Sequence, residues 1–142
     1  MKLFQERIRR KDEQIYVFDP IRKKNILLTP EEEVRQRLLD YLILEKKYSK
    51  NLIKIEGGVR VNKLQKRTDI LIYDRHSQPF MLIECKAPHV VLDAKTLQQA
   101  ANYNSQIQAP FLAISNGKQH FCFKINFNTK KTEQISDFPE MQ

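Results

Sequence analysis

Two acidic residues and one lysine stand at the edges of two short apolar segments of the chain. Asp69 lies near the start of the first segment, and Glu84 and Lys86 lie at the end of the second. In a β-strand, residues two positions apart point to the same face, so Glu84 and Lys86 are predicted to project together while Cys85 turns the other way. A hairpin would bring Asp69 beside them. Charges next to a β core are costly unless they are paired or bind a metal, so the two carboxylates predict an oxygen-ligand site for a hard cation, with Mg²⁺ as the expected ion.

Structural ion pairs are the alternative interpretation of these charges. Asp69 and Glu84 could pair with Lys86 and Arg67 at a sheet edge, which is the commoner fate of such residues. The basic residues just before Asp69 could instead contact phosphates, although a basic loop is usually only solvated. The candidates for nucleic-acid contacts there are Lys63, Lys66 and Arg67.

A second feature, the pair Gln99 and Tyr103, follows these charges along the chain. A helix is predicted from Asp93, its N-cap, to Ile107, with Pro110 beyond its end. The spacing of four puts Gln99 and Tyr103 on one face of this helix. Alone, Tyr103 is more often a core aromatic residue and Gln99 a solvated one.

The charged residues lie on a predicted sheet. Residues 68–73 and 79–85 are short apolar runs joined by a polar turn, as in two antiparallel strands buried on both faces. Asn116-Gly117 predicts a final hairpin. The order helix, three strands, helix, two strands implies a mixed sheet with helices packed on it. The predicted strands are residues 52–56, 59–61 as a continuation or partner, 68–73, 79–85, 111–115 and 119–127.

The first helix is predicted to begin at Thr29-Pro30, because threonine caps free amides and proline suits the first helical position. Three glutamates follow, where acids favour the positive end of the helix dipole, and we expect the helix to run to about Tyr48. Before it, apolar runs at residues 15–18 and 26–28 flank Asp19-Pro20 and predict a hairpin. The helical period puts Val34, Leu38, Tyr41 and Leu42 in the buried stripe and Arg35, Gln36, Asp40 and Lys47 toward solvent.

The composition indicates a globular domain with a polyanionic partner. The 142 residues are 41% hydrophobic and 30% charged, which argues against a disordered chain or a membrane protein. The charged N-terminus argues against a secretory signal, so a cytoplasmic location is expected. The net charge of +8 favours nucleic acid as the partner. The two cysteines, Cys85 and Cys122, are expected to be reduced core residues.

Two other kinds of site are not predicted. His76, His89 and His120 show no paired spacing and have no cysteine nearby, which argues against zinc. Ser115 has no histidine or acid placed to activate it within the local sequence, which argues against a serine hydrolase.

Asp69, 14 intervening residues and then Glu84-Cys85-Lys86 resemble the motif of the PD-(D/E)xK nuclease superfamily. Gln99-Ala-Ala-Asn-Tyr103 is similar to the Q-x-x-x-Y motif that several branches carry on the next helix. At closer range, residues 4–140 resemble stand-alone proteins related to the N-terminal nuclease domain of type I restriction enzyme R subunits. The residues that carry this likeness are Phe18-Asp-Pro-Ile-Arg22, Leu28-Thr-Pro-Glu-Glu32, Val34-Arg-Gln36, Ile83-Glu-Cys-Lys-Ala-Pro88, Gln99-Ala-Ala-Asn-Tyr-Asn104 and Ser115-Asn-Gly117.

This resemblance implies an α/β fold with a restriction-endonuclease-like core, a mixed central sheet flanked by helices, and a Mg²⁺-dependent DNA nuclease, with Mn²⁺ able to replace Mg²⁺. Lys86 would orient or deprotonate the attacking water, and Gln99 and Tyr103 would position the phosphate or the catalytic groups. The implied metal ligands are Asp69, Glu84, the Cys85 carbonyl and Glu32. Thr68 stands where many members have proline, outside the metal shell. The helix pattern puts Glu31 nearer the buried face, whereas the family pattern favours Glu32, which we choose.

The whole chain, residues 1–142, is predicted to be one domain, with an N-terminal basic hairpin at 1–28, a nuclease-like core at 29–127 and a C-terminal tail at 128–142. The alternative function is a non-catalytic nucleic-acid-binding or partner-binding module that keeps the nuclease fold, because the chain has no Walker-type motif and no room for a motor. Expected partners are DNA, a second copy in a homodimer, and a separate targeting or motor protein, with no membrane.

Overall fold

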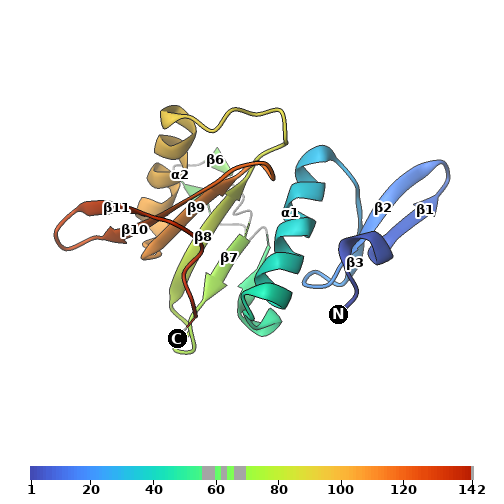
Figure 1. Ribbon diagram of the computed structural model, residues 1–142, viewed down its shortest axis with the longest axis horizontal. Coiled ribbons are helices and arrows are strands. Elements are labelled where there is room, and N and C mark those ends of the chain that lie inside the picture. Colours follow the sequence, from blue (N-terminus) through green and yellow to red (C-terminus); the bar gives the residue numbers. More distant parts are fainter. Residues whose placement is uncertain (56–59, 62–63, 66–69, 142) are drawn as a thin grey trace.

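The computed structural model describes residues 1–55, 60–61, 64–65 and 70–141. Its centre is a six-stranded sheet in the order β11-β10-β9-β8-β7-β4, in which β8 and β9 are parallel and the other neighbours are antiparallel (Figure 1). The predicted mixed sheet with helices is therefore confirmed. The strands of this sheet are β4 (Ile53–Lys54), β7 (Ile70–Tyr73), β8 (Pro79–Cys85), β9 (Phe111–Ser115), β10 (His120–Asn126) and β11 (Lys131–Ile135).

The N-terminal residues form a separate antiparallel sheet in the order β1-β2-β3. Its strands are β1 (Ile8–Lys11), β2 (Gln14–Asp19) and β3 (Lys24–Leu27), preceded by the 3-10 turn η1 (Phe4–Arg7). The predicted hairpin is the β2–β3 pair, whose turn is held by the Asp19 carboxylate, which accepts hydrogen bonds from the Ile21 and Arg22 amides at 2.7 and 2.9 Å. The sequence pattern does not predict β1, because three of its four residues are the consecutive charges Arg9, Arg10 and Lys11, which hide the alternation of a strand.

The first helix, α1 (Pro30–Asp40), begins where the sequence predicts. The Thr29 hydroxyl accepts from the Glu32 amide at 3.1 Å, which satisfies a free donor at the helix end. The helix continues through one wider turn, η2 (Tyr41–Glu45), and ends before the predicted Tyr48. The chain leaves the helix at Lys47, which adopts a left-handed conformation with φ of 62°. A further 3-10 turn, η3 (Lys50–Leu52), leads into β4.

The predicted exposure of Arg35 and Gln36 is wrong. Both side chains are buried, at 5% and 0% exposure, whereas the predicted stripe of Val34, Leu38 and Leu42 is buried as expected. The cause is the N-terminal sheet, which lies against the side of α1 that faces away from the central sheet (Figure 1). Helix α1 is therefore covered on two sides, and its polar residues meet a second layer rather than water.

Buried charges connect the N-terminal sheet to α1. Arg7 donates to the Phe18 carbonyl at 2.7 Å, to Gln36 at 2.6 Å and to Asp40 at 2.8 Å. Asp19, with no exposed surface, accepts from Arg22 at 2.7 Å and from Gln36 at 2.9 Å. Because each charge has hydrogen-bonding partners, the cost of burying it is offset.

Strand β8 separates two hydrophobic clusters. Its Met81, Ile83 and Cys85 belong to the cluster that includes Val34 and Leu38 of α1, so we name this side of the sheet the α1 face. Leu82 belongs to the other cluster, on the α2 face, with Ala100 and Tyr103. Helix α2 (Ala94–Ile107) connects β8 to β9, as a parallel pair requires. Its N-cap is Asp93, as predicted, which accepts from the Thr96 amide at 2.9 Å.

Other predicted elements are shorter or longer than expected. The strand at 52–56 reduces to β4, and the segment at 59–61 falls partly outside the described residues, which contain the small pair β5 (Arg60–Val61) and β6 (Leu64–Gln65). The tail expected at 128–142 contains β11, and Phe138 beyond it is buried. Both cysteines are reduced and buried, as expected. Within the described residues, no helix has the length and apolar character needed to cross a bilayer.

Replacing Asp19 with alanine will destabilise the protein, because Arg22 and Gln36 would lose the carboxylate that they share. We expect a loss of about 3–5 kcal/mol in the free energy of unfolding, as for the removal of one partner from a buried ion pair. Urea denaturation followed by circular dichroism measures it. Glu133→Ala on β11, at an exposed position, is the control and should change stability by less than about 0.5 kcal/mol. Equal effects for both variants would contradict this role for Asp19.

Stability will also depend on pH through Asp19. Burial raises the pKa of this carboxyl, but hydrogen bonds and the charge of Arg22 outweigh burial and leave the pKa below its ordinary value of 3.8. The contribution of the ionised group is therefore complete above pH 3.8 and is lost as the pH falls through the lower folded-state pKa. Urea titrations across this range should show the stability difference between the natural protein and Asp19→Asn shrinking with acid. A stability difference that does not change with pH would argue against this contribution of the ionised Asp19 carboxylate.

Candidate active site

The carboxyl end of β8 carries a pair of opposite charges. The Lys86 Nζ lies 3.3 Å from the Glu84 Oε1, and the two side chains are 29% and 23% exposed. Cys85 between them is 1% exposed and packs in the cluster on the α1 face. The Lys86 amide donates to the Ser115 carbonyl at 2.8 Å, which extends the β8–β9 pairing as far as Lys86. Glu84 and Lys86 therefore project together, as their spacing predicts.

Several predicted site residues lie outside the described residues. These are Asp69, which was expected to join Glu84, and the basic residues Lys63, Lys66 and Arg67. Their roles stay predictions.

Glu32 lies in the buried charges between α1 and the N-terminal sheet. Its carboxylate accepts from Arg35 at 2.5 Å through one oxygen and from Arg22 and Gln36, each at 3.0 Å, through the other. Glu31 is the more exposed of the two acids, with 48% of its side chain accessible, so the helix pattern that put Glu31 nearer the buried face is wrong. The N-terminal sheet, which that pattern did not include, buries Glu32 instead. Its role as a metal ligand stays a prediction.

Of the predicted pair on α2, Tyr103 lies in the core and Gln99 is exposed to solvent. Tyr103 is 4% exposed and packs with Leu71 and Leu82 on the α2 face, the face from which Glu84 also projects. Gln99, one turn earlier on the helix, is exposed. The structure thus gives Tyr103 a packing role whatever chemistry occurs nearby.

The donor chemistry at this sheet edge fits a hard cation. The Glu84 carboxylate and the adjacent Cys85 carbonyl are oxygen donors of the kind that Mg²⁺ prefers. Within the described residues, no three His, Cys, Asp or Glu side chains gather as a metal-binding cluster, and Asp69 lies outside them. Glu84 and Cys85 would thus supply part of a ligand set.

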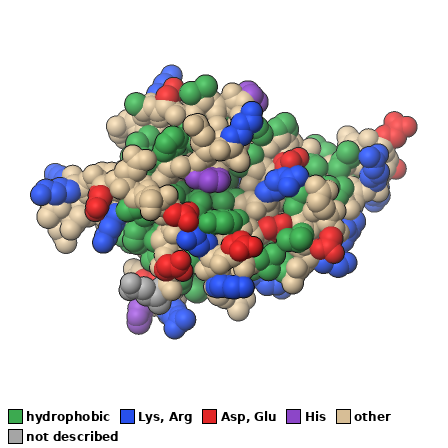
Figure 2. Space-filling view, in the orientation of Figure 1, with side chains coloured by type: hydrophobic (Ala, Val, Ile, Leu, Met, Phe, Trp, Pro, Cys, Tyr) green, Lys and Arg blue, Asp and Glu red, His purple; other side chains and the backbone are tan. Residues whose placement is uncertain are grey.

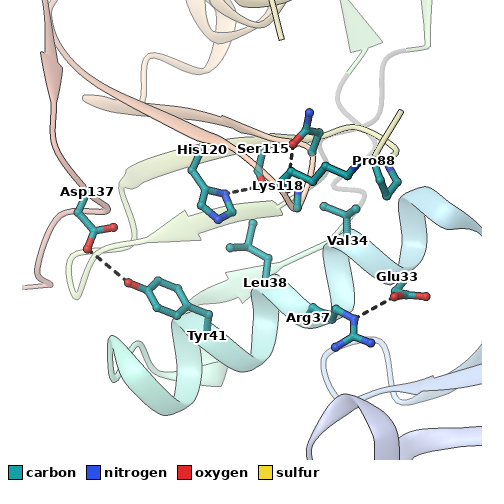
Figure 3. A pocket seen from close by; sticks show the side chains of 12 residues that line it. Glu33, Val34, Arg37, Leu38, Tyr41, Pro88, Ser115, Lys118, His120 and Asp137 are labelled. Atoms are coloured by element: carbon teal, nitrogen blue, oxygen red, sulfur yellow. Dashed lines mark hydrogen bonds and ion pairs between the residues drawn. The ribbon is translucent and has the colours of Figure 1, made fainter. Parts of the chain in front are cut away.

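A cavity of about 480 Å³ opens at the same sheet edge, between α1 and the turn that joins β9 to β10 (Figure 3). Inside it, the His120 Nδ1 lies 2.7 Å from the Ser115 Oγ. The expectation that no histidine lies near Ser115 is therefore wrong. Residues 115 and 120 are directly opposite in the β9–β10 register, so counting outward from the predicted Asn-Gly turn could have found this pair.

A basic groove of about 460 Å³ lies by the N-terminal sheet. Its lining has no carboxylate, and within the described residues no ion pair involves its exposed lysines. On the face seen in Figure 2, blue Lys and Arg side chains lie among red Asp and Glu side chains over the N-terminal sheet. The groove is lined by Met1, Lys2, Arg7, Arg9, Phe18, Pro20, Lys23 and Lys50.

Comparison with known proteins gives one family. Residues 30–139 match the type I restriction enzyme R protein N terminus family, a region that runs from α1 past β11. A fragment structure assigned to an HsdR subunit of a type I restriction enzyme from Vibrio vulnificus is 25% identical, with a TM-score of 0.41. That match covers 62% of this chain and 16% of that one. No curated protein matches this sequence. Since the family match spans most of the chain, this protein belongs to the type I restriction enzyme R protein N terminus family.

Proposed function

We propose that this protein is a Mg²⁺-dependent nuclease that hydrolyses DNA. The observation that carries the proposal is the Glu84–Lys86 pair, which projects from the carboxyl end of a central strand in a chain of this family. A carboxylate and an ammonium side by side can hold a divalent cation and offset the charge of a phosphoryl transition state. Partial exposure of both side chains leaves them accessible to a substrate.

Glu84, the Cys85 carbonyl and Asp69 would hold Mg²⁺, with Mn²⁺ able to replace it and Glu32 as a further candidate ligand. When bound, the cation would polarise the scissile phosphate and lower the pKa of a water molecule. Lys86 would orient or deprotonate the attacking water and then stabilise the developing negative charge. The 3.3 Å contact with Glu84 restrains the Lys86 ammonium at this edge. Gln99 and Tyr103 would position the phosphate from the α2 face.

The basic groove would bind the DNA backbone. Lys2, Arg9, Lys23 and Lys50 are exposed cations beside Phe18 and Pro20. Groups of this kind contact phosphates without reading sequence. Lys63, Lys66 and Arg67 are further candidates for phosphate contacts, by their place just before Asp69. A homodimer and a separate targeting or motor protein stay part of the proposal.

A non-catalytic nucleic-acid-binding module is the second candidate function. One observation favours it: the acids Glu32 and Glu84 both lie in ion pairs with cations of the chain itself. Such pairs can hold a fold together without any metal. The two candidates differ in whether a divalent ion binds and whether DNA is cut.

Mg²⁺ and Mn²⁺ are expected to bind the natural protein in calorimetric titrations that include non-cleavable DNA, and Glu84→Gln should abolish this binding.

Lys86→Ala should lower the rate of DNA cleavage by at least about 100-fold, the usual contribution of a positioned acid–base group. Glu133→Gln and Lys124→Ala, at exposed positions of β11 and β10, are the matched controls. DNA binding without cleavage in either ion would refute the nuclease and favour the non-catalytic module.

Substituting Lys23 and Lys50 together with glutamine should weaken DNA binding and reduce its salt dependence. Each lost phosphate contact lowers the slope of log K against log salt by about 0.9 on duplex DNA. The double variant should therefore lose a slope of about 2, measured by fluorescence anisotropy between low and moderate salt. Lys95→Gln with Lys124→Gln removes the same charge elsewhere on the surface and serves as the control. An equal change in both double variants would show a general charge effect rather than a binding groove.

A further inference from the structure

The cavity between α1 and the β9–β10 turn has apolar walls. Val34, Leu38 and Tyr41 of α1 form one wall, and Pro88 of the loop after β8 lies opposite (Figure 3). The volume of about 480 Å³ lies within the range of small-ligand sites, in which apolar walls carry a few fixed polar groups. Such walls bind by shape and by removal of apolar surface from water.

One wall of the cavity carries a histidine with a defined donor. Ser115 is fully buried, and its Oγ accepts from the Gly117 amide at 3.1 Å. The Ser115 hydroxyl can donate its proton to the His120 Nδ1, which lies 2.7 Å away. In the tautomer that accepts this bond, the imidazole proton is on Nε2. Burial lowers the pKa of His120, which favours the neutral ring. In this tautomer His120 offers a single N–H donor to a ligand.

Among the described residues that line the cavity, Lys118 is the cation outside an ion pair. Glu33 pairs with Arg37 at 2.9 Å, and Asp137 pairs with Lys46 at 3.1 Å. Lys118 forms no ion pair among the described residues. A ligand with a ring acceptor for His120 and one nearby negative charge for Lys118 would match these groups. A nucleotide unit has both features, in its base and its phosphate.

Ser115 links this cavity to the candidate active site. Its carbonyl accepts from the Lys86 amide at 2.8 Å, while its hydroxyl lies 2.7 Å from His120. Pro88 follows Lys86 by two residues and lines the cavity. The charged pair and the cavity thus occupy the same edge of the sheet, on its α2 and α1 faces. A nucleic-acid strand that crosses this edge can place a phosphate at Lys86 and a neighbouring base in the cavity.

We propose that the cavity lined by His120, Lys118 and Leu38 receives one unpaired base of the nucleic-acid substrate, beside the phosphate that is cut. This inference rests on the proposed function and names the substrate class as strands with an unpaired base at the cut site. A base in a duplex is stacked and paired, so it cannot enter such a cavity without being extruded.

The test follows the His120 ring resonances of the full chain by NMR during titrations without divalent ions, so that binding is measured apart from cleavage. The probes are dAMP, deoxyribose 5-phosphate, inorganic phosphate, a single-stranded adenine hexanucleotide and a short duplex. We expect dAMP and the single strand to shift His120 saturably, and the other probes to bind at least about tenfold more weakly. Lys118→Ala should weaken dAMP binding severalfold, and so should His120→Ala when binding is followed through the backbone amide resonances of residues 115–118, whereas His76→Ala, at an exposed turn, should not.

Each outcome tests the base-binding proposal independently of the proposed nuclease activity. Equal shifts with deoxyribose 5-phosphate would show a phosphate site and overturn the base assignment. Shifts with dAMP but not with the single strand would show a site for free nucleotides and overturn the substrate assignment. DNA cleavage by the same preparation with no shift of His120 would overturn the cavity proposal and leave the nuclease standing. If the single strand shifts His120 but no DNA is cleaved with Mg²⁺ or Mn²⁺, the base-binding proposal would stand and the nuclease proposal would be refuted.

Discussion

Strand β8 is hydrogen-bonded on both sides, and this double pairing constrains the rest of the molecule. It runs antiparallel to β7 and parallel to β9. A parallel neighbour cannot be reached by a tight turn, so the chain must cross over through α2, which covers one face of the sheet. Alternation along β8 then assigns Ile83 and Cys85 to the α1 face and Leu82 to the α2 face. The same alternation sends Glu84 and Lys86 together toward the α2 face, at the edge where the parallel strands end.

The N-terminal sheet is stabilised by contacts with α1 rather than by a core of its own. Three short strands bury little apolar surface, and a small isolated sheet is marginally stable in water. Its contacts are instead buried hydrogen-bonded charges, in which Arg7 joins Gln36 and Asp40 while Arg22 joins Asp19 and Glu32. Such contacts add little net stability compared with apolar packing. They require a defined geometry, because a displaced partner would leave an unpaired charge in the protein interior. They therefore fix how α1 is oriented and where Glu32 lies.

Ser115 connects the Glu84–Lys86 pair and the cavity, which lie on opposite faces of one sheet edge. Its main chain completes the ladder at Lys86 and its side chain reaches His120. The turn that follows is held close to α1, where a Cβ added at Gly117 would approach Val34 Cγ2 to 3.2 Å and the φ of 86° favours glycine. The rim of the cavity and the end of β8 are thus connected directly through Ser115. Movement of either would change the distance between the charged pair and the cavity.

Elements with local signals could be predicted from the amino-acid sequence. Thr29-Pro30 and Asp93 begin their helices as helix capping predicts, and the spacing of Glu84 and Lys86 is enough to put them on one side of a strand. The burial of polar residues, by contrast, depends on how the elements pack together in three dimensions. Helical periodicity finds one apolar stripe, so Arg35 and Gln36 read as solvated until a second layer covers them. The same holds for the burial of Glu32 rather than Glu31 and for β11. Each depends on a partner that is distant in the chain or across a strand register, and no local pattern encodes that partner.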